Sequence, residues 1–292
     1  MKLLLLANPA AAGWRARRLL PAIQQLIARQ VPGFDYHESQ DAADLRRQAE
    51  SAARAGYERV LVAGGDGSAH AAVNALRGTD AALGMVPLGH GNDLARALGV
   101  PLEPLAAVEF LLRAPIVSMD LARVGDTAYA CVAGAGLDAA TNRRANSWGG
   151  WLTGHTRYFL IALYTLASYQ PIRIRLTSDA ENFSGEVMWV AVANTPNYGG
   201  GLPIAPRARL DDGLLDVCII ERISKIGLLR LYPSLRRGTH LQAPGVRYFR
   251  SSRLHLETPE GADLYGDGEF LARLPLEICI EPASLRVLGR LS

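Results

Sequence analysis

The chain has 292 residues, of which 49% are hydrophobic and 20% are charged, and its formal net charge is +3. This composition excludes a disordered or fibrous protein, and the small charge gives no argument for a nucleic-acid partner. The length exceeds that of most single domains, so we expect two. The cysteines, Cys131, Cys218 and Cys279, lie far apart without metal-ligand spacing, which predicts buried thiols in a reducing cytoplasm.

The first residues predict a β-strand at 2–7, which Asn8 and Pro9 end. Its apolar run is too short for the core of a signal peptide. A helix is expected at 14–30, a short strand at 34–37 and a second helix at 42–55. The chain therefore begins as alternating strands and helices.

The first motif that suggests chemistry lies at residues 60–76. Four apolar residues lead into a turn made of Gly64, Gly65, Asp66, Gly67 and Ser68, and an alanine-rich helix follows. Glycines let the backbone approach an anion, and the N–H groups of a first helical turn point at it. Because a carboxylate repels a polyphosphate unless a cation lies between them, Asp66 suggests Mg²⁺. An ordinary strand–helix turn with Asp66 as the helix cap is an equal alternative.

A second loop of this kind follows an expected strand at 82–87. It contains Gly89, His90, Gly91, Asn92 and Asp93, and a helix runs from it to about residue 98. Strands that alternate with helices form a parallel sheet, and loops at the carboxyl ends of such strands line the ligand site. The loops at Asn8, Gly64 and Gly89 all fall at such ends, which favours nucleotide binding.

After a further helix at 103–113 the pattern changes to strands near residue 117. Strands are expected at 121–124, 127–133, 172–177, 186–193, 213–220, 248–257 and 274–281, with helices only at 153–168 and 225–236. Several alternate apolar with polar residues, as half-buried antiparallel strands do. We predict an α/β domain at 1–122, to which 284–292 returns, and an all-β sandwich or barrel at 123–283.

Three turns in the second half of the chain contain residues that could have a catalytic or binding role. Asp267 and Glu269 flank a glycine in a tight turn, either as solvated acids or as a general base with its partner. Asp212 lies in a loop whose carbonyls suit a hard cation, or in an Asp-Gly turn. The glycines at 134–136 allow the close approach of an unidentified group.

Two apolar segments of the expected second domain are candidates for an interaction surface or for core packing. Residues 158–169 form an apolar run of about twelve residues, whereas a membrane-spanning helix needs about twenty. Residues 226–237 combine leucines with arginines, which suits either an anionic membrane surface or core packing with an exposed basic face.

The motifs NPxxxG, GGDGS, PLGHGND, GAGLDA, DDGLLDV and YGDGE occur in this order along nearly the whole chain. This set resembles the diacylglycerol kinase catalytic family, and most closely the bacterial lipid kinases of the YegS and DgkB type. The resemblance implies an N-terminal α/β domain like those of NAD kinase and phosphofructokinase, and a C-terminal β-sandwich. It also implies ATP between the domains and Mg²⁺-dependent transfer of the γ-phosphoryl group to a lipid hydroxyl.

The resemblance also assigns roles to individual residues. It implies nucleotide binding by Asn8, Ser39, Gly64, Gly65, Asp66, Gly67, Ser68, Asn74, Gly89, His90, Gly91, Asn92 and Asp93. Asp66 and Asp93 would support the catalytic metal, and Asp267 or Glu269 would be the base. Asp212, with the carbonyls of Arg209 and Leu214, matches a structural Mg²⁺ site.

Four positions depart from the family pattern. Ser68 replaces the usual threonine and keeps a hydroxyl, and Ser39 stands in for a threonine after the second strand. His90 stands where threonine is usual, and its ring is larger and titrates near neutral pH. Ala12 replaces a serine and removes one phosphate contact.

Two other functions fit parts of the pattern. A NAD kinase shares the GGDG loop but acts on a soluble dinucleotide, and a non-enzymatic member would bind nucleotide or lipid as a regulator. As a lipid kinase the protein would be cytoplasmic, with peripheral and transient contact to the membrane that presents its substrate. Diacylglycerol, phosphatidylglycerol, ceramide and a sphingoid base offer similar hydroxyls, and the sequence indicates neither the acceptor nor the oligomeric state.

Overall fold

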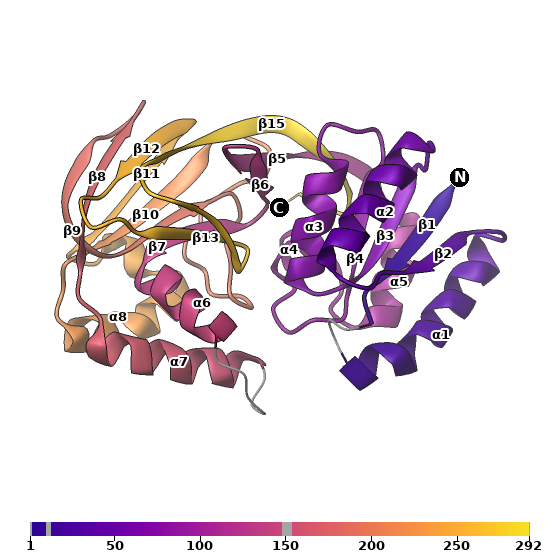
Figure 1. Cartoon of the computed structure of the whole chain (residues 1–292), viewed down its shortest axis with the longest axis horizontal. Helices are drawn as coiled ribbons and strands as arrows, with labels where there is room; N and C mark the ends of the chain where they lie inside the picture. The colour runs from indigo at the N-terminus through magenta and orange to yellow at the C-terminus, as the bar shows by residue number, and fades with distance from the viewer. Residues whose placement is uncertain (1, 10–12, 148–153, 292) are drawn as a thin grey trace. The chain divides into compact units, whose positions relative to one another are not determined.

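A computed structural model describes residues 2–9, 13–147 and 154–291 (Figure 1). The chain divides into two compact units, one formed by Met1–Leu121 with Pro282–Ser292 and the other by Ala122–Glu281. Strands β5 (Ile116–Val124) and β15 (Leu276–Leu288) each begin in one unit and end in the other. Each unit is described by itself below.

The first unit is built on a parallel sheet in the order β2-β1-β3-β4, and Val287 of β15 pairs beside β4. Its strands are β1 (Leu3–Ala7), β2 (Asp35–Glu38), β3 (Arg59–Gly64) and β4 (Ala82–Pro87). Every residue of β1 and β4 is buried, as expected of parallel strands that are covered on both faces.

Five helices belong to this unit. They are α1 (Gly13–Gln30), α2 (Ala42–Arg54), α3 (Asp66–Leu76), α4 (Asp93–Ala97) and α5 (Pro104–Arg113). The side chain of Asp41 caps α2 by accepting a hydrogen bond from the N–H of Asp44 at 2.7 Å. Helix α2 packs against α3, and α1 packs against α5, so that helices cover the sheet in two layers.

The second unit is built from antiparallel strands in the order β14-β13-β7-β9-β8-β12-β15, with β10 and β11 added at β9. They are β6 (Thr127–Tyr129), β7 (Val132–Gly136), β8 (Ile172–Ser178), β9 (Phe183–Ala193), β10 (Leu215–Glu221), β11 (Val246–Ser251), β12 (Arg253–Glu257), β13 (Asp263–Gly266) and β14 (Glu269–Arg273). The second half of β9 pairs with β7 on one edge and with β10 on the other. Inward-facing valine, leucine and isoleucine side chains of these strands form one core.

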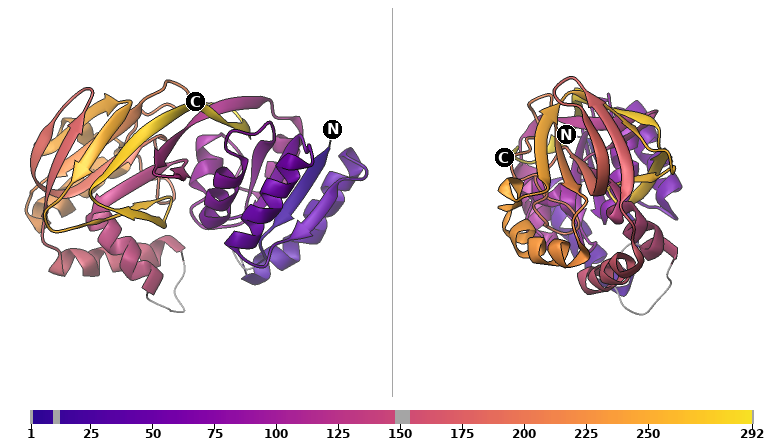
Figure 2. Two further views of the ribbon diagram at one scale, coloured as in Figure 1. Left: turned by 45° about the horizontal axis from the view of Figure 1, so that its top comes forward. Right: turned by 90° about the vertical axis from the view of Figure 1, so that its left-hand side faces the viewer.

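The helices of the second unit lie together on one side of its strands (Figures 1 and 2). They are α6 (Leu137–Ser147), α7 (Gly154–Ser168), α8 (Lys225–Arg237) and the 3-10 turn η1 (His240–Gln242). The hydroxyl of Ser224 caps α8 by accepting from the N–H of Gly227 at 3.0 Å. Gly238 ends this helix in the left-handed conformation, at φ 69°.

The predicted change from a parallel α/β domain to a strand-rich domain is confirmed, but some details of the prediction were wrong. The single strand predicted at 127–133 is two strands, β6 and β7. Helix α6 was not expected, because its sequence has little apolar periodicity. The single strand predicted at 248–257 is two strands, β11 and β12, which pair with different neighbours. The chain bends where Ser251 and Ser252 bind the carboxylate of Asp179, and the buried positions change there from Phe249 and Ser251 to Leu254 and Leu256.

Within the described residues, we find no helix whose length and apolar character together would allow it to cross a membrane.

Candidate functional site

The first glycine loop joins β3 to α3, and its packing leaves no room for a side chain on Gly64. A Cβ atom there would lie 2.4 Å from the Oγ of Ser68, so residue 64 has to be glycine. Ser68 is buried, and its Oγ accepts a hydrogen bond from the Nδ2 of Asn8 at 3.2 Å. The first turn of α3 starts directly after Gly65, which is the arrangement that binds anions at a helix N-terminus.

The second glycine loop joins β4 to α4 and closes on itself through Asn92. This residue adopts the left-handed conformation, at φ 53°. Its Oδ1 accepts from the N–H of Gly89 at 3.1 Å, and its Nδ2 donates to the carbonyl of Gly89 at 2.8 Å. The Nε of Arg96 donates to the carbonyl of Gly91 at 3.0 Å. These bonds fix the loop before any ligand binds.

Asp66 joins the two loops. Its Oδ2 accepts from the N–H of Asn92 at 3.0 Å, and its Oδ1 accepts from the N–H of Asp93 at 2.9 Å. A Cβ on Gly91 would lie 2.4 Å from Oδ2 of Asp66, and one on Gly89 would lie 2.5 Å from the Cα of Gly65. The carboxylate therefore holds the second loop against the first, and its predicted contact with Mg²⁺ stays a prediction.

The other predicted nucleotide residues occupy different surroundings. Ser39 is buried directly after β2, where its Oγ donates to the carbonyl of Ala7, the last residue of β1, at 3.1 Å. Asn74 lies two turns along α3, where its Nδ2 donates to the carbonyl of His70 at 3.0 Å. His90 is exposed in the second loop, whereas Ala12 lies outside the described residues. The structure thus brings the two glycine loops and Asn8 together, with Asn74 further away along its helix.

The two carboxylates of the acidic hairpin between β13 and β14 have different surroundings. Asp267 has φ 53°, and its Oδ2 accepts from the N–H of Ala130 at 2.7 Å. Its Oδ1 accepts from the N–H groups of Cys131 and Val132 at 2.9 and 3.3 Å. Glu269 is exposed at the start of β14. Asp267 therefore holds the chain before β7 in place, and the choice of base between the two acids stays open.

The predicted magnesium loop places Asp212 beside an arginine. Its carboxylate forms an ion pair with Arg250, and its Oδ1 accepts from the N–H of Leu214 at 3.2 Å. Arg250 also approaches the buried Asp216 at 3.8 Å, and burial raises the pKa of Asp216 to about 6. Across the described part of the chain, no three His, Cys, Asp or Glu side chains are grouped to hold a metal. A metal ion here would have to compete with the guanidinium, so the role of Arg209, Asp212 and Leu214 stays a prediction.

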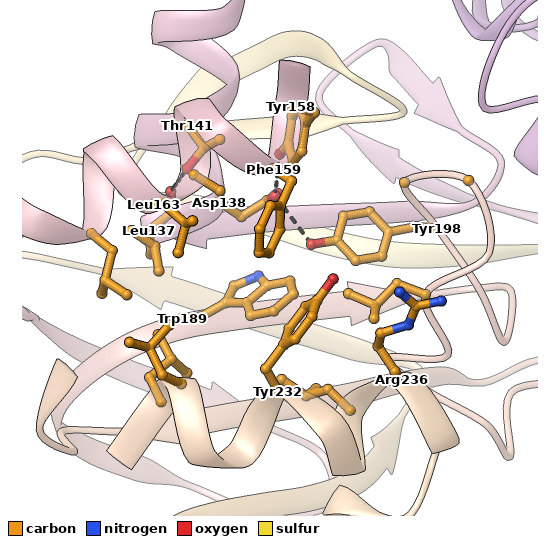
Figure 3. A pocket seen from close by; sticks show the side chains of 18 of the residues that line it. Leu137, Asp138, Thr141, Tyr158, Phe159, Leu163, Trp189, Tyr198, Tyr232 and Arg236 are labelled. Atoms are coloured by element: carbon orange, nitrogen blue, oxygen red, sulfur yellow. Dashed lines mark hydrogen bonds between the residues drawn. The ribbon is translucent and has the colours of Figure 1, made fainter. Parts of the chain in front are cut away.

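A cavity of about 480 Å³ lies in the second unit, between α6, α7, α8 and the glycine-rich segment 198–202 (Figure 3). Most of its lining is apolar. The apolar and aromatic side chains are Leu137, Phe159, Ala162, Leu163, Leu166, Trp189, Leu202, Leu228, Leu229, Tyr232 and Leu235. This volume and character are those of a site for a small apolar ligand or for part of a lipid.

One polar cluster lies in this cavity, centred on the buried carboxyl of Asp138. Its Oδ1 accepts from the hydroxyls of Tyr158 at 2.8 Å and Tyr198 at 3.1 Å, and its Oδ2 accepts from the Nδ2 of Asn142 at 3.3 Å (Figure 3). Burial raises the pKa of Asp138, although the two tyrosine hydrogen bonds act against this shift. Burial also raises the pKa of Tyr158 far above its usual value. The cavity thus offers a hydrogen-bonding cluster at Asp138 within largely apolar walls, and Tyr232 and Arg236 add polar groups to its lining.

No individual role was predicted for Asp138, Tyr158 or Tyr198. The glycines before Asp138 were expected only to allow close approach, and a Cβ on Gly134 would indeed lie 2.5 Å from its Oδ2. The available signal was an acidic residue directly after an apolar, glycine-rich strand. The apolar run at 158–169 lines the cavity with Tyr158, Phe159 and Leu163.

Two family models match the chain. The diacylglycerol kinase catalytic domain matches residues 2–124, and the YegS C-terminal NAD kinase beta sandwich-like domain matches residues 131–289. These matches agree with the α/β fold of the first unit and identify the strand-rich second unit as sandwich-like.

Similar proteins carry related names. A diacylglycerol kinase of Mycobacterium tuberculosis is 38% identical over 255 residues, which cover 85% of this chain and 82% of the relative. A "probable lipid kinase YegS-like" protein of Pseudomonas aeruginosa is 32% identical over 292 residues, covering 98% and 93%. The crystal structure of a diacylglycerol kinase from Bacillus anthracis shares the fold, with a TM-score of 0.78, 19% identity and coverage of 99% and 97%. The chain is therefore a kinase that belongs to the diacylglycerol kinase catalytic family, with a YegS-type C-terminal domain.

Proposed function

We propose that the protein transfers the γ-phosphoryl group of ATP to the hydroxyl of a membrane lipid of the diacylglycerol type. The observation that carries this proposal is the apolar cavity around Asp138 in a chain that also has two preorganised glycine loops. A kinase that phosphorylates a soluble acceptor would not need a cavity with so many apolar lining residues. Membership of the family indicates the reaction class, phosphoryl transfer, and the apolar cavity supports a lipid as the acceptor.

The nucleotide side of the proposal rests on the first unit. The N-terminus of α3 carries a partial positive charge that favours the triphosphate, and Gly64 and Gly89 allow backbone to approach it closely. Asp66 sets the geometry of both loops, so that their N–H groups need no rearrangement during phosphoryl transfer. When bound, Mg²⁺ would neutralise charge on the phosphates, and the carboxylates of Asp66 and Asp93 are the oxygen donors that suit it.

The acceptor side rests on the second unit. The apolar lining from α7 and α8 fits an acyl chain, which gains free energy by leaving water. The cluster of Asp138, Tyr158 and Tyr198 fits the ester or hydroxyl groups at the polar end of the lipid, because hydroxyls donate and accept hydrogen bonds. One of the hairpin acids, Asp267 or Glu269, would accept the proton of the attacking hydroxyl.

The acceptor class is tested with labelled ATP, Mg²⁺ and either mixed lipid extracts or NAD. We expect label in a product that extracts into organic solvent. Label that appears only in NADP would favour the NAD kinase alternative, and no transfer to any lipid alcohol would favour a non-enzymatic role.

The cavity is tested with the substitution Ala162→Trp, which fills it from α7. We expect the KM for the lipid to rise about tenfold or more, because the indole occupies space needed by the acyl chain, while the KM for ATP stays unchanged. Ala180→Trp, in the exposed turn between β8 and β9, is the matched control. An unchanged lipid KM in a folded Ala162→Trp protein would remove the cavity from the acceptor site.

A further inference from the structure

Asn194 is a buried polar residue that has no role in the phosphoryl transfer as proposed above. It follows β9 directly, and its exposed fraction is 0%. Burying an amide is unfavourable unless its hydrogen bonds are made, so its partners indicate what it does. The Nδ2 of Asn194 donates to the carbonyl of Ala130 at 2.9 Å, and its main-chain N–H donates to the carbonyl of Cys131 at 2.8 Å. Asn194 therefore binds carbonyl groups of the segment immediately before β7.

The same segment is also bound by Asp267, which follows the other neighbour of β7. Strand β7 lies between β9 and β13 and is antiparallel to both, so the ends of β9 and β13 lie beside the start of β7. Asn194 comes directly after β9, and Asp267 comes directly after β13. Asp267 accepts the N–H groups of residues 130–132, whereas Asn194 donates to carbonyls of residues 130 and 131. The two residues thus bind complementary groups of one segment.

A single peptide group connects the two side chains. In the peptide between Ala130 and Cys131, the carbonyl accepts from the Nδ2 of Asn194 at 2.9 Å. The N–H of the same peptide donates to the Oδ1 of Asp267, also at 2.9 Å. Because a peptide group is planar, a bond that fixes its carbonyl also fixes the direction of its N–H, and bonds at both ends strengthen each other. Asn194 therefore orients a hydrogen-bond donor of Asp267.

The acidic hairpin depends on this segment for its position. Asp267 has φ 53°, a conformation that is uncommon outside glycine and persists where surrounding contacts hold it. Those contacts are its bonds to residues 130–132, including the bond from its own N–H to the carbonyl of Val132 at 3.1 Å. Glu269 follows two residues later, at the start of β14. Both candidate bases therefore move if the segment moves.

We propose that Asn194 is a positioning residue for the acidic hairpin and that it acts on Asp267 through the peptide between Ala130 and Cys131. The described residues that line the cavity do not include Asn194, so we expect it to affect the chemical step more than the binding of the acceptor. This catalytic effect rests on the proposed function, in which a hairpin acid accepts the proton of the lipid hydroxyl. The positioning of Asp267 does not, and it is measured separately.

The catalytic effect is tested with Asn194→Leu, because leucine has a similar branched shape but donates no hydrogen bond. We expect kcat to fall roughly tenfold or more, since the hairpin acid is displaced, while the KM values for ATP and lipid stay within about twofold. The hydroxyl of Tyr129, which donates to the carbonyl of Val192 at 3.2 Å, still anchors the segment to β9 in this variant. Kinetics are measured well below the Tm of the variant, so that all of the protein is folded.

The route through the peptide is tested by amide hydrogen exchange, followed by NMR on the full chain without nucleotide or lipid. The N–H groups of Ala130 and Cys131 donate to Asp267, so their exchange reports on the far end of the connection. We expect both to exchange roughly tenfold faster in Asn194→Leu. A general loss of stability would also accelerate exchange in β8, whose amides should keep their parent rates.

Thr195→Val is the matched control, because Thr195 is the next residue and is equally buried. Its Oγ1 donates to the carbonyl of Asn197 at 2.9 Å, within its own loop. Valine removes this bond and keeps the shape, so kcat and the exchange of Ala130 and Cys131 should stay within about twofold of the parent values. If Asn194→Leu does not fold, the milder Asn194→Ser, whose side chain is shorter, takes its place in both measurements.

Three outcomes would overturn the proposal. The first is unchanged kcat and unchanged exchange in the folded Asn194 variant. The second is a fall in kcat with unchanged exchange at Ala130 and Cys131, because the effect would then not pass through their peptide. The third is an equal loss in Thr195→Val. If both amides exchange faster in the variant but the parent protein phosphorylates no lipid, the positioning of Asp267 stands and the proposed function fails.

Discussion

The two units contain the same strand–glycine–helix connection, but the residues that surround this connection differ between the units. In the first unit β3 leads to α3, and a Cβ on Gly64 would lie 2.4 Å from the Oγ of Ser68. In the second unit β7 leads to α6, and a Cβ on Gly134 would lie 2.5 Å from the Oδ2 of Asp138. In both places glycine is needed four residues before an oxygen-bearing side chain of the first helical turn. The local backbone requirement is therefore the same.

The carboxylates of these helical turns have different partners. The two oxygens of Asp66 accept from two separate main-chain N–H groups of a neighbouring loop. In Asp138, one oxygen accepts from both tyrosine hydroxyls, inside a largely apolar cavity. The comparison teaches that the motif fixes the backbone, whereas the neighbouring elements decide whether the carboxylate binds main-chain N–H groups or tyrosine hydroxyls.

The same substitution at Asp66 and at Asp138 should therefore differ in its effect on activity, with the larger loss at Asp66. In Asp66→Asn the amide NH₂ would face one of the two N–H donors, so the second loop loses a hydrogen bond and moves. Displacement of a reacting group by about 1 Å costs about 100-fold in rate, and we expect kcat/KM to fall by at least this factor. The measurement is lipid phosphorylation, with nucleotide affinity measured in parallel.

Asp41→Asn is the control for this substitution. The Oδ1 of Asp41 accepts one N–H bond at the start of α2, which an amide oxygen can also accept. Activity should stay within about twofold of the parent protein. If Asp66→Asn also retained activity, Asp66 would not be the residue that orders the two loops.

Asp267 extends the comparison, because it belongs to the second unit but has main-chain partners like those of Asp66. Both of its oxygens accept N–H groups from residues 130–132. We expect Asp267→Asn to lower the free energy of unfolding by about 1–3 kcal/mol and Tm by roughly 2–10 °C. We also expect it to lower activity.

Glu269→Gln separates stability from catalysis at the same hairpin. Glu269 is exposed, so Tm should change by less than about 1 °C. A large loss of kcat in Glu269→Gln at unchanged Tm would assign the base to Glu269. Full activity of this variant would leave Asp267 as the base, and an unchanged Tm in Asp267→Asn would contradict its structural role.

The sequence predicted the first unit well because its signals are local. Buried parallel strands are continuous apolar runs, and each glycine loop follows one of them directly, so β3, Gly64 and α3 could be placed from a few adjacent residues. The family resemblance then supplied the roles of the loops. It could not indicate that Asp66 binds the backbone of Asn92 and Asp93, since this contact joins residues 26 and 27 positions apart.

The second unit was harder to predict because its important contacts are distant in sequence. The cluster at Asp138 needs Tyr158 and Tyr198, which lie 20 and 60 residues further along the chain. Arg250, which pairs with Asp212, lies 38 residues away and competes with the predicted metal. Helix α6 was missed for a related reason, since its apolar contacts come from distant elements instead of from a regular pattern of its own.

Asp138→Asn should have a much smaller effect on activity than Asp66→Asn. The amide oxygen can accept both tyrosine hydroxyls, since both donate to the same oxygen of Asp138. Activity should therefore fall by less than about threefold. The expected change is in stability, and it depends on pH.

Burial raises the pKa of Asp138, so the folded protein keeps this proton to higher pH than the unfolded chain does. The parent protein therefore loses stability as pH rises from about 4 through the folded-state pKa, because ionisation is easier after unfolding. Asparagine does not ionise, so it does not carry this cost of burying a charge. We expect the Tm of Asp138→Asn to exceed that of the parent at pH 8, with a smaller or reversed difference at pH 4. Thermal unfolding across this pH range checks the slope, with the exposed Asp211→Asn as the control. A lower Tm of Asp138→Asn at pH 8 would mean that Asp138 is ionised and stabilised in the cavity, and the contrast with Asp66 would then disappear.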